Sequence, residues 1–379
     1  MPPRLFILRE FPVSKRDYDR IVVDLLSEYF SVTVLDCTPW LHSDFWQRYS
    51  SWAYHHPGYV SVSAMGELLP HLGAGPEAVA IDYLADSPPS RRIRTELKKR
   101  GIPRAIVQPG LVPTLPNTET RSQRVRRILS SPLALPGRVV DRVRGHLDPQ
   151  LPEMAVLSGA AGLGEWVRDV PHKIWTHSFD YDLYLSLRGD AAAGVQPYAV
   201  FLDEDMAFHT DYDFLGLELP VTPERYYSAL NRFFDRFQRE AGLPVVVAGH
   251  PRHVRPGMWE ERTPVYNQTA ELVRDAAIVL GHASTSISFA VLWSKPVVCL
   301  TTSELSRSST GARIELVSGI LSAPLIDVDA PGAALHSDAF RHVNQAAYDR
   351  YQQDYIKRPG TPDLPVWRIF SEYVRANVL

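Results

Sequence analysis

The chain has 379 residues, enough for two domains of ordinary size, each with its own hydrophobic core. It carries 40 Lys and Arg against 43 Asp and Glu, a net charge of −3, so it lacks the basic field that nucleic-acid binding uses. No uncharged apolar run approaches the roughly 20 residues that a membrane-spanning helix needs, and the apolar run near the N-terminus is shorter than the core of a signal peptide. The two cysteines, Cys37 and Cys299, lie in apolar runs, as reduced core thiols do. We therefore expect a cytoplasmic protein that does not bind nucleic acid.

Short apolar runs alternate with amphipathic segments through the first half of the chain. Expected helices lie at 15–29 and 90–100, where apolar residues recur on one helical face. The expected strands, in order, are 5–8, 32–35, 59–62, 78–81, 105–107, 154–157 and 173–175. Strands that alternate with helices are typical of a parallel, doubly wound sheet that is covered on both faces.

One segment departs from this alternation. Residues 121–144 carry seven Arg against one Asp, interleaved with Val, Ile and Leu. A basic amphipathic surface of this kind can lie on anionic lipid, which predicts peripheral contact with the inner face of the membrane. A solvated helical hairpin with an apolar underside is the alternative interpretation.

A second series of strands and helices begins after the small-residue segment GDAAAGVQ at 189–196. Its expected strands are 198–202, 243–248, 277–281 and 296–300, and its expected helices are 222–241, 269–274 and 284–293. The residues from 339 onward are helical in pattern, and we expect the last helix to pack back across both domains. The sequence thus predicts an α/β protein with two Rossmann-like, doubly wound domains, residues 1–192 and 193–379, that face a central cleft and close about a hinge near Gly194.

Three adjacent acids follow the first strand of the second series. In an open parallel sheet, ligands bind outside the carboxyl ends of the strands, because loops and helix N-termini gather there. Asp203, Glu204 and Asp205 repel one another at such a strand end, which favours a functional role as a general base. A charged turn with an Asp cap for the next helix is the alternative. Metal binding is conceivable for this cluster, although its spacing does not require it.

The next two strand ends carry groups suited to a phosphate. After 243–248, a glycine allows close backbone approach and His and Arg supply hydrogen-bond donors; these residues are Gly249, His250, Pro251 and Arg252. After 277–280, three hydroxyls stand beside the free N–H groups of a helix start; this stretch comprises Gly281, His282, Ser284, Thr285 and Ser286. Simple N-capping by Ser284 is the alternative there.

Further polar residues are candidates for the acceptor side of the cleft. They are His177, Asp180 and Asp182 near the domain border, and His209 in the loop after the acids. The sequence contains no P-loop, zinc-ligand spacing or nucleophile elbow, so neither a metal nor an organic cofactor is expected.

These motifs resemble those of GT-B-type glycosyltransferases. More narrowly, they are similar to the bacterial sialyltransferases and Kdo transferases of capsule and lipopolysaccharide assembly, which use CMP-activated sugars. Those families carry an acidic motif with the catalytic base, a His-Pro motif that contacts the donor phosphate, and a Ser/Thr motif that cradles it. The matching positions, in the same order along the chain, are Asp203-Glu204-Asp205, His250-Pro251 and Ser284-Thr285-Ser286. Asp205 stands where the sialyltransferase motif usually ends in Gly.

The resemblance implies a metal-independent glycosyltransferase that moves Kdo or a sialic-acid-like sugar from a CMP donor to a bacterial surface glycan or glycolipid. One alternative is a GT-B transferase that uses a UDP-, GDP- or TDP-sugar, and another is a CDP-glycerol-type phosphotransferase. A sugar-nucleotide epimerase and a non-catalytic nucleotide-sugar-binding subunit complete the set of interpretations.

Overall fold

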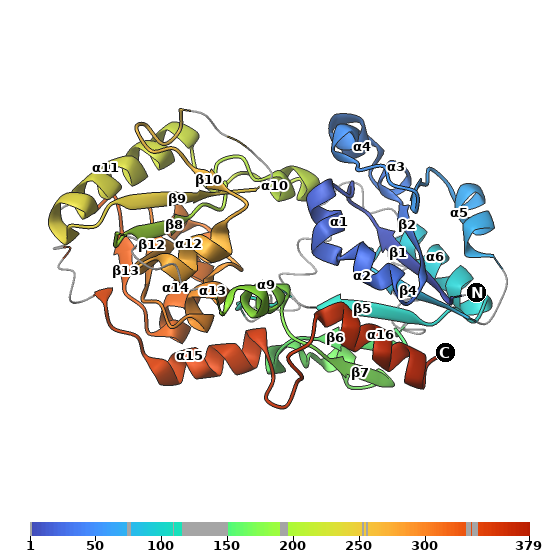
Figure 1. Cartoon of the computed structure of the whole chain (residues 1–379). Coiled ribbons are helices and arrows are strands. Elements are labelled where there is room, and N and C mark those ends of the chain that lie inside the picture. Colours follow the sequence, from blue (N-terminus) through green and yellow to red (C-terminus); the bar gives the residue numbers. More distant parts are fainter. Residues whose placement is uncertain are drawn as a thin grey trace, which may run out of the picture.

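A seven-stranded parallel sheet forms the core of the first domain (Figure 1). The computed structural model describes residues 2–73, 77–108, 110–115, 151–189, 196–251, 254, 257–330, 335 and 340–379. In spatial order the strands are β3 (Tyr59–Ser61), β2 (Ser31–Asp36), β1 (Arg4–Arg9), β4 (Ala78–Asp82), β5 (Arg104–Gln108), β6 (Met154–Leu157) and β7 (His172–Trp175). Successive side chains of β1 point to opposite faces, so Leu5 and Ile7 join one buried cluster while Phe6 and Leu8 join another.

A six-stranded parallel sheet forms the core of the second domain. In spatial order its strands are β10 (Val265–Tyr266), β9 (Val245–Gly249), β8 (Ala199–Leu202), β11 (Ile278–Gly281), β12 (Val297–Thr301) and β13 (Leu325–Asp327). The chain adds β9 and β10 on one side of β8 and then returns to its other side with β11. The strand order therefore reverses between β8 and β11, which is the position where doubly wound folds bind ligands. The expected fold class, two parallel α/β domains, is confirmed.

Helices cover both sheets. The described α-helices before β7 are α1 (Lys15–Ile21), α2 (Val23–Ser27), α3 (Thr38–Leu41), α4 (Ser43–Tyr49), α5 (Met65–Leu72) and α6 (Pro88–Lys99). Those after β7 are α9 (Phe179–Leu187), α10 (Thr210–Leu215), α11 (Pro223–Ala241), α12 (Thr269–Asp275), α13 (Ile287–Leu292), α14 (Ser309–Leu321), α15 (Gln345–Tyr351) and α16 (Val366–Asn377). Helix α11 begins with a proline and is closed by Gly242, whose φ of 70° gives the left-handed conformation typical of helix ends. It packs on the second sheet, where the rings of Phe234 and Phe201 are 5.1 Å apart.

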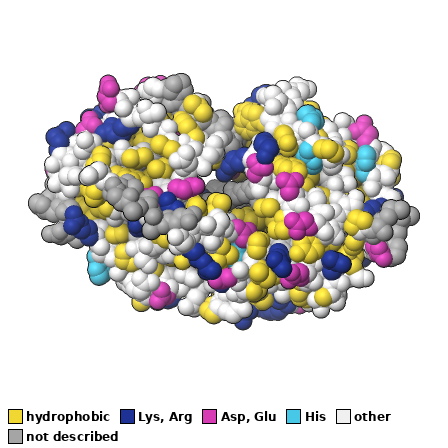
Figure 2. Space-filling view, in the orientation of Figure 1, with side chains coloured by type: hydrophobic (Ala, Val, Ile, Leu, Met, Phe, Trp, Pro, Cys, Tyr) yellow, Lys and Arg dark blue, Asp and Glu magenta, His cyan; other side chains and the backbone are white. Residues whose placement is uncertain are grey.

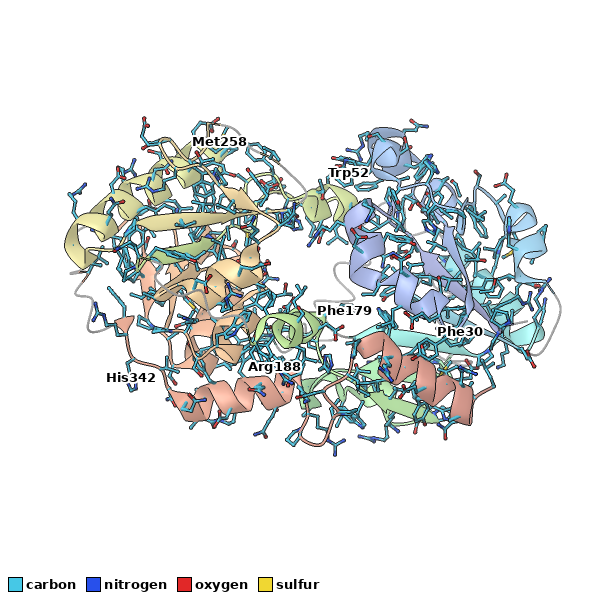
Figure 3. The ribbon with its side chains drawn as sticks, in the orientation of Figure 1. Phe30, Trp52, Phe179, Arg188, Met258 and His342 are labelled. Atoms are coloured by element: carbon cyan, nitrogen blue, oxygen red, sulfur yellow. The ribbon has the colours of Figure 1, made fainter. Side chains whose placement is uncertain are left out.

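The chain crosses between the domains twice. After β7 it enters α9, which packs against α12 and α13 of the second domain. Phe179 lies at the start of α9, where the two lobes meet (Figure 3). Near the C-terminus, α16 returns to the first domain and buries Trp367 and Phe370 fully in its core. The expected return of the last helix is confirmed, and the packing groups α9 with the second domain although it precedes position 192.

Several elements differ from the sequence expectations. The helix expected at 15–29 is two helices, because Val22 (φ 50°) takes the left-handed conformation between α1 and α2 and its N–H bonds to the Asp19 carbonyl. Strands β10 and β13 span two and three residues, too short for a periodic pattern to predict. Helix α14 is also additional, since its buried residues include Thr, Gly and Ser and do not form an apolar stripe.

The basic segment 121–144, Gly194 and Arg252 lie outside the described residues. In the described part of the chain, no helix is both long enough and apolar enough to cross a membrane. The surface is notched where the two lobes meet (Figure 2).

Candidate active site

Three loops of the second domain lie side by side at one edge of its sheet. Strands β9, β8 and β11 are neighbours, and all three run parallel. Their registers pair Leu202 with Ala248 and Phe201 with Leu280, so the strands end at the same edge. The acidic loop after β8 therefore stands between the loop of His250 and the loop of Ser284.

The acidic loop is bonded to both of its neighbours. One carboxylate oxygen of Asp203 accepts a hydrogen bond from the backbone N–H of His250 (3.4 Å), and the other accepts from the N–H of Asp205 (2.8 Å). A carboxylate oxygen of Glu204 accepts a hydrogen bond from the backbone N–H of Ala283 (2.8 Å). Asp203 and Glu204 therefore hold the two flanking loops against the end of β8.

Asp205 is the fully buried residue of the acidic loop. It has no exposed surface, and its φ of 50° is left-handed. Glycine adopts this conformation freely and aspartate tolerates it, which explains how Asp205 occupies the place of the motif's usual Gly. Because a substrate does not reach a fully buried carboxyl, we correct the expectation that Asp205 takes part in catalysis. Asp203 and Glu204 are each partly exposed as residues, so they remain the candidate acids of this loop.

The carboxyl of Glu204 has an unusual acidity. Burial raises its pKa to about 7, against the lowering effects of the Ala283 N–H and of the positive charge of Arg313. The negative charge of the neighbouring Asp203 contributes to this rise. A carboxyl that titrates near pH 7 is suited to take up or release a proton at neutral pH.

His250 and His209 form a pair of rings beside the acidic loop. Their ring centroids are 5.2 Å apart. The Nδ1 atom of His209 accepts a hydrogen bond from the backbone N–H of Asp211 and so caps α10. His209 was a candidate for the acceptor side, but the structure places it against the His-Pro loop of the second domain. Pro251 follows His250 and is partly exposed.

The two strand-end glycines differ in what they provide. A Cβ atom at Gly249 would lie 2.5 Å from Cε1 of Tyr266 on the neighbouring strand β10, so glycine there makes room for that ring. A Cβ atom at Gly281 would lie 3.6 Å from Leu202, an ordinary contact, so packing does not require glycine at that position.

His282 is a core residue. Its buried Nδ1 lies 2.7 Å from the carbonyl oxygen of Leu300, and its Nε2 lies 2.8 Å from the hydroxyl of Tyr226. Because a carbonyl only accepts, Nδ1 carries the proton and Nε2 accepts from Tyr226. Burial lowers the pKa of the ring to about 4, so it is neutral. We therefore correct the expectation of direct phosphate contact: His282 holds the turn that precedes Ser284.

The turn formed by Ser284, Thr285 and Ser286, called the hydroxyl turn below, is partly exposed at the sheet edge. Ser284 accepts a hydrogen bond from the backbone N–H of Ser286 (3.2 Å), and α13 begins at the next residue. The hydroxyls of Thr285 and Ser286 make no hydrogen bond within the described part of the chain. These two side chains are therefore the hydroxyl donors that the turn offers to a ligand.

The candidates near the domain border hold the C-terminal segment. His177 is fully buried, with Nε2 2.7 Å from the carbonyl oxygen of Leu364. The carboxylate of Asp182 accepts a hydrogen bond from the backbone N–H of Val366 (3.2 Å), where α16 begins. Asp180 lies in the first turn of α9 and is partly exposed. We therefore correct the expectation that His177 and Asp182 line the acceptor side of the cleft. Both lie where the chain crosses between the domains.

Two further residues of the second domain have no counterpart in the sequence expectations. The positive charge of Arg313 on α14 lowers the pKa of the Glu204 carboxyl. Phe214 on α10 packs against Phe11 and His42 of the first domain, with ring centroids 5.4 and 4.5 Å away. Neither residue follows a strand directly, and the reading of strand ends therefore misses both. An arginine or phenylalanine alone in a helix carries no local signal of function.

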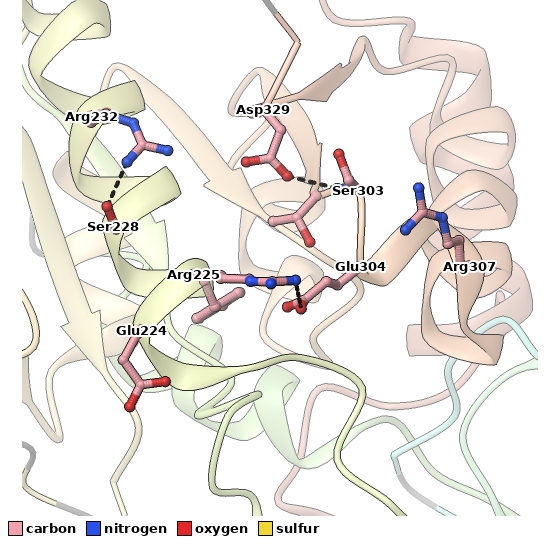
Figure 4. A pocket seen from close by; sticks show the side chains of 10 residues that line it. Glu224, Arg225, Ser228, Arg232, Ser303, Glu304, Arg307 and Asp329 are labelled. Atoms are coloured by element: carbon pink, nitrogen blue, oxygen red, sulfur yellow. Dashed lines mark hydrogen bonds and ion pairs between the residues drawn. The ribbon is translucent and has the colours of Figure 1, made fainter.

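A polar pocket of about 360 Å³ lies between the start of α11 and the loops after β12 and β13 (Figure 4). Its charged lining is balanced: Arg225, Arg232 and Arg307 stand with Glu224, Glu304 and Asp329. Glu304 accepts hydrogen bonds from the N–H and hydroxyl of Thr222 (2.8 and 2.9 Å), the residue before α11. This pocket contains none of the residues singled out from the sequence, and we do not assign it the chemistry.

No family model matches the chain, and no curated protein matches its sequence. Solved structures do match. A variant of the wall teichoic acid polymerase TagF aligns with a TM-score of 0.55 and 9% identity over 100% of this chain and 89% of that chain. Another TagF variant, soaked with CDPG, gives 0.55 and 10% over the same shares. The calicheamicin glycosyltransferase CalG4 aligns with a TM-score of 0.51 and 12% identity over 99% of this chain and 98% of that chain.

The chain has the GT-B fold. Two parallel-sheet α/β domains joined by a returning C-terminal helix align with these structures over almost their whole length. At identities this low, the structural alignments show the fold alone. The role of each residue rests on the geometry of the strand-end loops.

Proposed function

We propose that this protein is a glycosyltransferase that moves a sugar from a nucleotide-activated donor to an acceptor hydroxyl. The observation that carries the proposal is the bonding of Asp203 and Glu204 to the two loops on either side of them. A histidine loop, two acids and a hydroxyl turn thus meet where the strand order of the second sheet reverses. The donor would bind along this edge and the acceptor on the first domain.

The groups at this edge suit the chemistry of transfer. The acceptor oxygen forms a bond to the anomeric carbon as the bond from that carbon to the donor phosphate breaks. Glu204 or Asp203 takes the acceptor proton, a step typically worth about 10²- to 10⁴-fold in rate. Donors near His250 and the Ser284 turn stabilise the phosphate that leaves with the electron pair.

A cytidine nucleotide is the proposed leaving group. The motifs Asp203-Glu204-Asp205, His250-Pro251 and Ser284-Thr285-Ser286 resemble those of CMP-sugar transferases, so a CMP-activated Kdo or sialic-acid-like sugar is the first candidate. A CDP-glycerol-type phosphotransferase is the second, because a TagF variant soaked with CDPG is among the similar structures. Both candidates share the cytosine base and differ in the phosphates.

Calorimetric titration with CMP, CDP, UDP and GDP tests this proposal. We expect CMP or CDP to bind most tightly, and His250→Ala to weaken that binding. Preference for UDP or GDP would rule out a cytidine donor. No binding by any of the four nucleotides would overturn the transferase assignment.

The acceptor is proposed to be a bacterial surface glycan or glycolipid at the cytoplasmic face of the membrane. The seven arginines of segment 121–144 support contact with anionic lipid. Sedimentation with vesicles of phosphatidylglycerol and phosphatidylcholine should pull down the protein at low salt. Equal sedimentation with pure phosphatidylcholine, or none with either, would remove the membrane contact from the proposal.

A further inference from the structure

Arg313 is a half-buried arginine near the acidic loop. Its Nε atom is buried and donates no hydrogen bond, and its guanidinium forms no ion pair with any described residue. A buried donor that leaves water without finding an acceptor costs about 1–3 kcal/mol in other proteins. Such a group in a native structure calls for an explanation.

Two other arginines show how this protein compensates for a buried Nε atom that lacks a hydrogen bond. Arg9 and Arg236 also have a buried Nε without a hydrogen-bond acceptor. Each stacks on an aromatic ring, Arg9 4.6 Å from the centroid of Tyr83 and Arg236 5.7 Å from that of Phe233. Arg313 has no such ring within the described residues. No described residue supplies a hydrogen-bond acceptor for its Nε atom.

The start of α14 is held firmly at the edge of the sheet. A Cβ atom at Gly311 would lie 2.1 Å from the carbonyl oxygen of Leu305, so the helix presses on the turn that follows β12. Thr310 and Arg313 share one face of the helix because they are three residues apart. The hydroxyl of Thr310 lies 3.0 Å from that of Tyr212 on α10. Arg313 therefore faces the side on which α10 and the acidic loop lie.

Glu204 links Arg313 to the hydroxyl turn. The charge of Arg313 acts on the Glu204 carboxyl, and the same carboxyl accepts a hydrogen bond from Ala283, one residue before Ser284. The positive charge of Arg313 and the N–H at the start of the hydroxyl turn thus act on the same carboxyl. An anion bound at this edge would meet the positive charge of Arg313 and hydroxyl donors from Thr285 and Ser286.

We propose that Arg313 binds a phosphate group of the donor beside the Ser284–Ser286 turn. The fork of N–H groups on a guanidinium matches two oxygens of one phosphate, which makes arginine suited to this contact. Its positive charge offsets the negative charge that the phosphate gains as its bond to the sugar breaks. The inference rests on the proposed function and adds to it a cation that none of the three motifs contains.

Binding of phosphorylated and unphosphorylated ligands to Arg313→Ala, Arg313→Lys and wild type tests the inference. The probes are CMP, cytidine and inorganic pyrophosphate, measured by calorimetry. We expect Arg313→Ala to weaken CMP binding by about 10- to 100-fold and to leave cytidine binding unchanged, with Arg313→Lys in between. Arg239→Ala, an exposed arginine in the last turn of α11, is the matched control and should bind all three probes as wild type does.

The outcomes separate this inference from the proposed function. If wild type binds CMP and Arg313→Ala binds it equally well, the role of Arg313 is overturned and the transferase proposal stands. If wild type binds pyrophosphate but no nucleotide, and Arg313→Ala loses pyrophosphate, the transferase proposal is overturned and the phosphate site stands. If wild type binds none of the probes, both are overturned. A lowered Tm of Arg313→Ala with unchanged CMP affinity would assign Arg313 a structural role instead.

Discussion

The backbone N–H of Ala283 donates a hydrogen bond to the carboxylate of Glu204 across the boundary between β8 and β11 (2.8 Å). One side chain therefore serves two parts of the proposed site. It anchors the turn that offers hydroxyls to the donor phosphate, and it presents a carboxyl that titrates near neutral pH. Binding of the donor and the protonation state of Glu204 are consequently coupled.

Replacement of Glu204 by glutamine separates these two parts. In Glu204→Gln, the side-chain carbonyl still accepts the bond from Ala283, but the residue no longer takes a proton. We expect donor binding to persist and the turnover rate to fall by about 10²- to 10⁴-fold. Turnover and nucleotide affinity measured on the same preparation check this result. A variant with wild-type turnover would remove Glu204 from the list of bases and leave Asp203.

The pH profile of wild type follows from the same carboxyl. Burial raises the pKa of Glu204 to about 7, and only the ionised form accepts a proton, so kcat should rise with pH through about 7 and then level off. In Asp203→Asn, loss of the charge that helps to raise the pKa of Glu204 should move the rise in kcat to lower pH. If the rise in kcat persists in an active Glu204→Gln variant, another group causes it.

Loss of the Tyr226 hydroxyl should destabilise the second domain. In Tyr226→Phe, Nε2 of the buried His282 loses its donor, because the opposite nitrogen is committed to the Leu300 carbonyl. We expect the free energy of unfolding to fall by about 1–3 kcal/mol, measured by urea denaturation. Tyr184→Phe is the control, since the Tyr184 hydroxyl makes no hydrogen bond within the described residues. Equal losses in the two variants would contradict the assigned proton positions.

The crossing between the domains should make stability depend on pH. Burial raises the pKa of Asp182 to about 7, so the folded state keeps a proton that the unfolded chain releases near pH 4. Its contribution is present below pH 4 and is lost as the pH rises to about 7. Asp182→Asn keeps an acceptor for Val366 and cannot ionise, so relative to wild type it should gain about 1–4 kcal/mol between pH 4 and pH 8.

Asp363 provides the opposite case for the same measurement. Its hydrogen bonds with Lys357, Arg188 and Tyr181 hold the pKa of its carboxyl well below the usual range. Its contribution is therefore present above the ordinary pKa and is lost in acid, so Asp363→Asn should lose stability at neutral pH. Urea denaturation of both variants at several pH values checks the two signs. Parallel pH dependence in the two variants would contradict the assignment.

Helix α10 connects the acidic loop of the second domain to the first domain. The ring of Phe214 contacts His42 and Phe11, and Asp213 pairs with Arg48 at 2.7 Å near the surface. Packing of the ring should matter more than the exposed ion pair, which is worth about 0–1 kcal/mol. We expect Phe214→Ala to increase the radius of gyration measured by small-angle scattering and to raise the rate of donor hydrolysis. Asp213→Ala should change both quantities little. A Phe214→Ala protein with unchanged scattering and hydrolysis would show that α10 does not hold the cleft.

Much of this architecture is legible in local sequence. Runs such as Val245–Ala248 bury both faces of a strand and end in glycine, so their type and their ends follow from residues that are adjacent in the chain. The order of strands and helices then predicts parallel sheets, and parallel sheets place successive strand ends at one edge. These local facts predict that the loops of Asp203, His250 and Ser284 share one edge, and the observed strand order makes them neighbours there.

Which side chains reach that edge was decided by tertiary structure. His282 and Asp205 stand in the same loops as accessible residues, but packing against Tyr226 and the left-handed turn of the acidic loop bury them. His177 bonds to the returning C-terminal segment. Arg313 belongs to α14, a helix that follows a later strand, β12. Burial and charge at a point in space depend on segments far apart in the chain, and a local pattern carries no record of which distant segments will meet there.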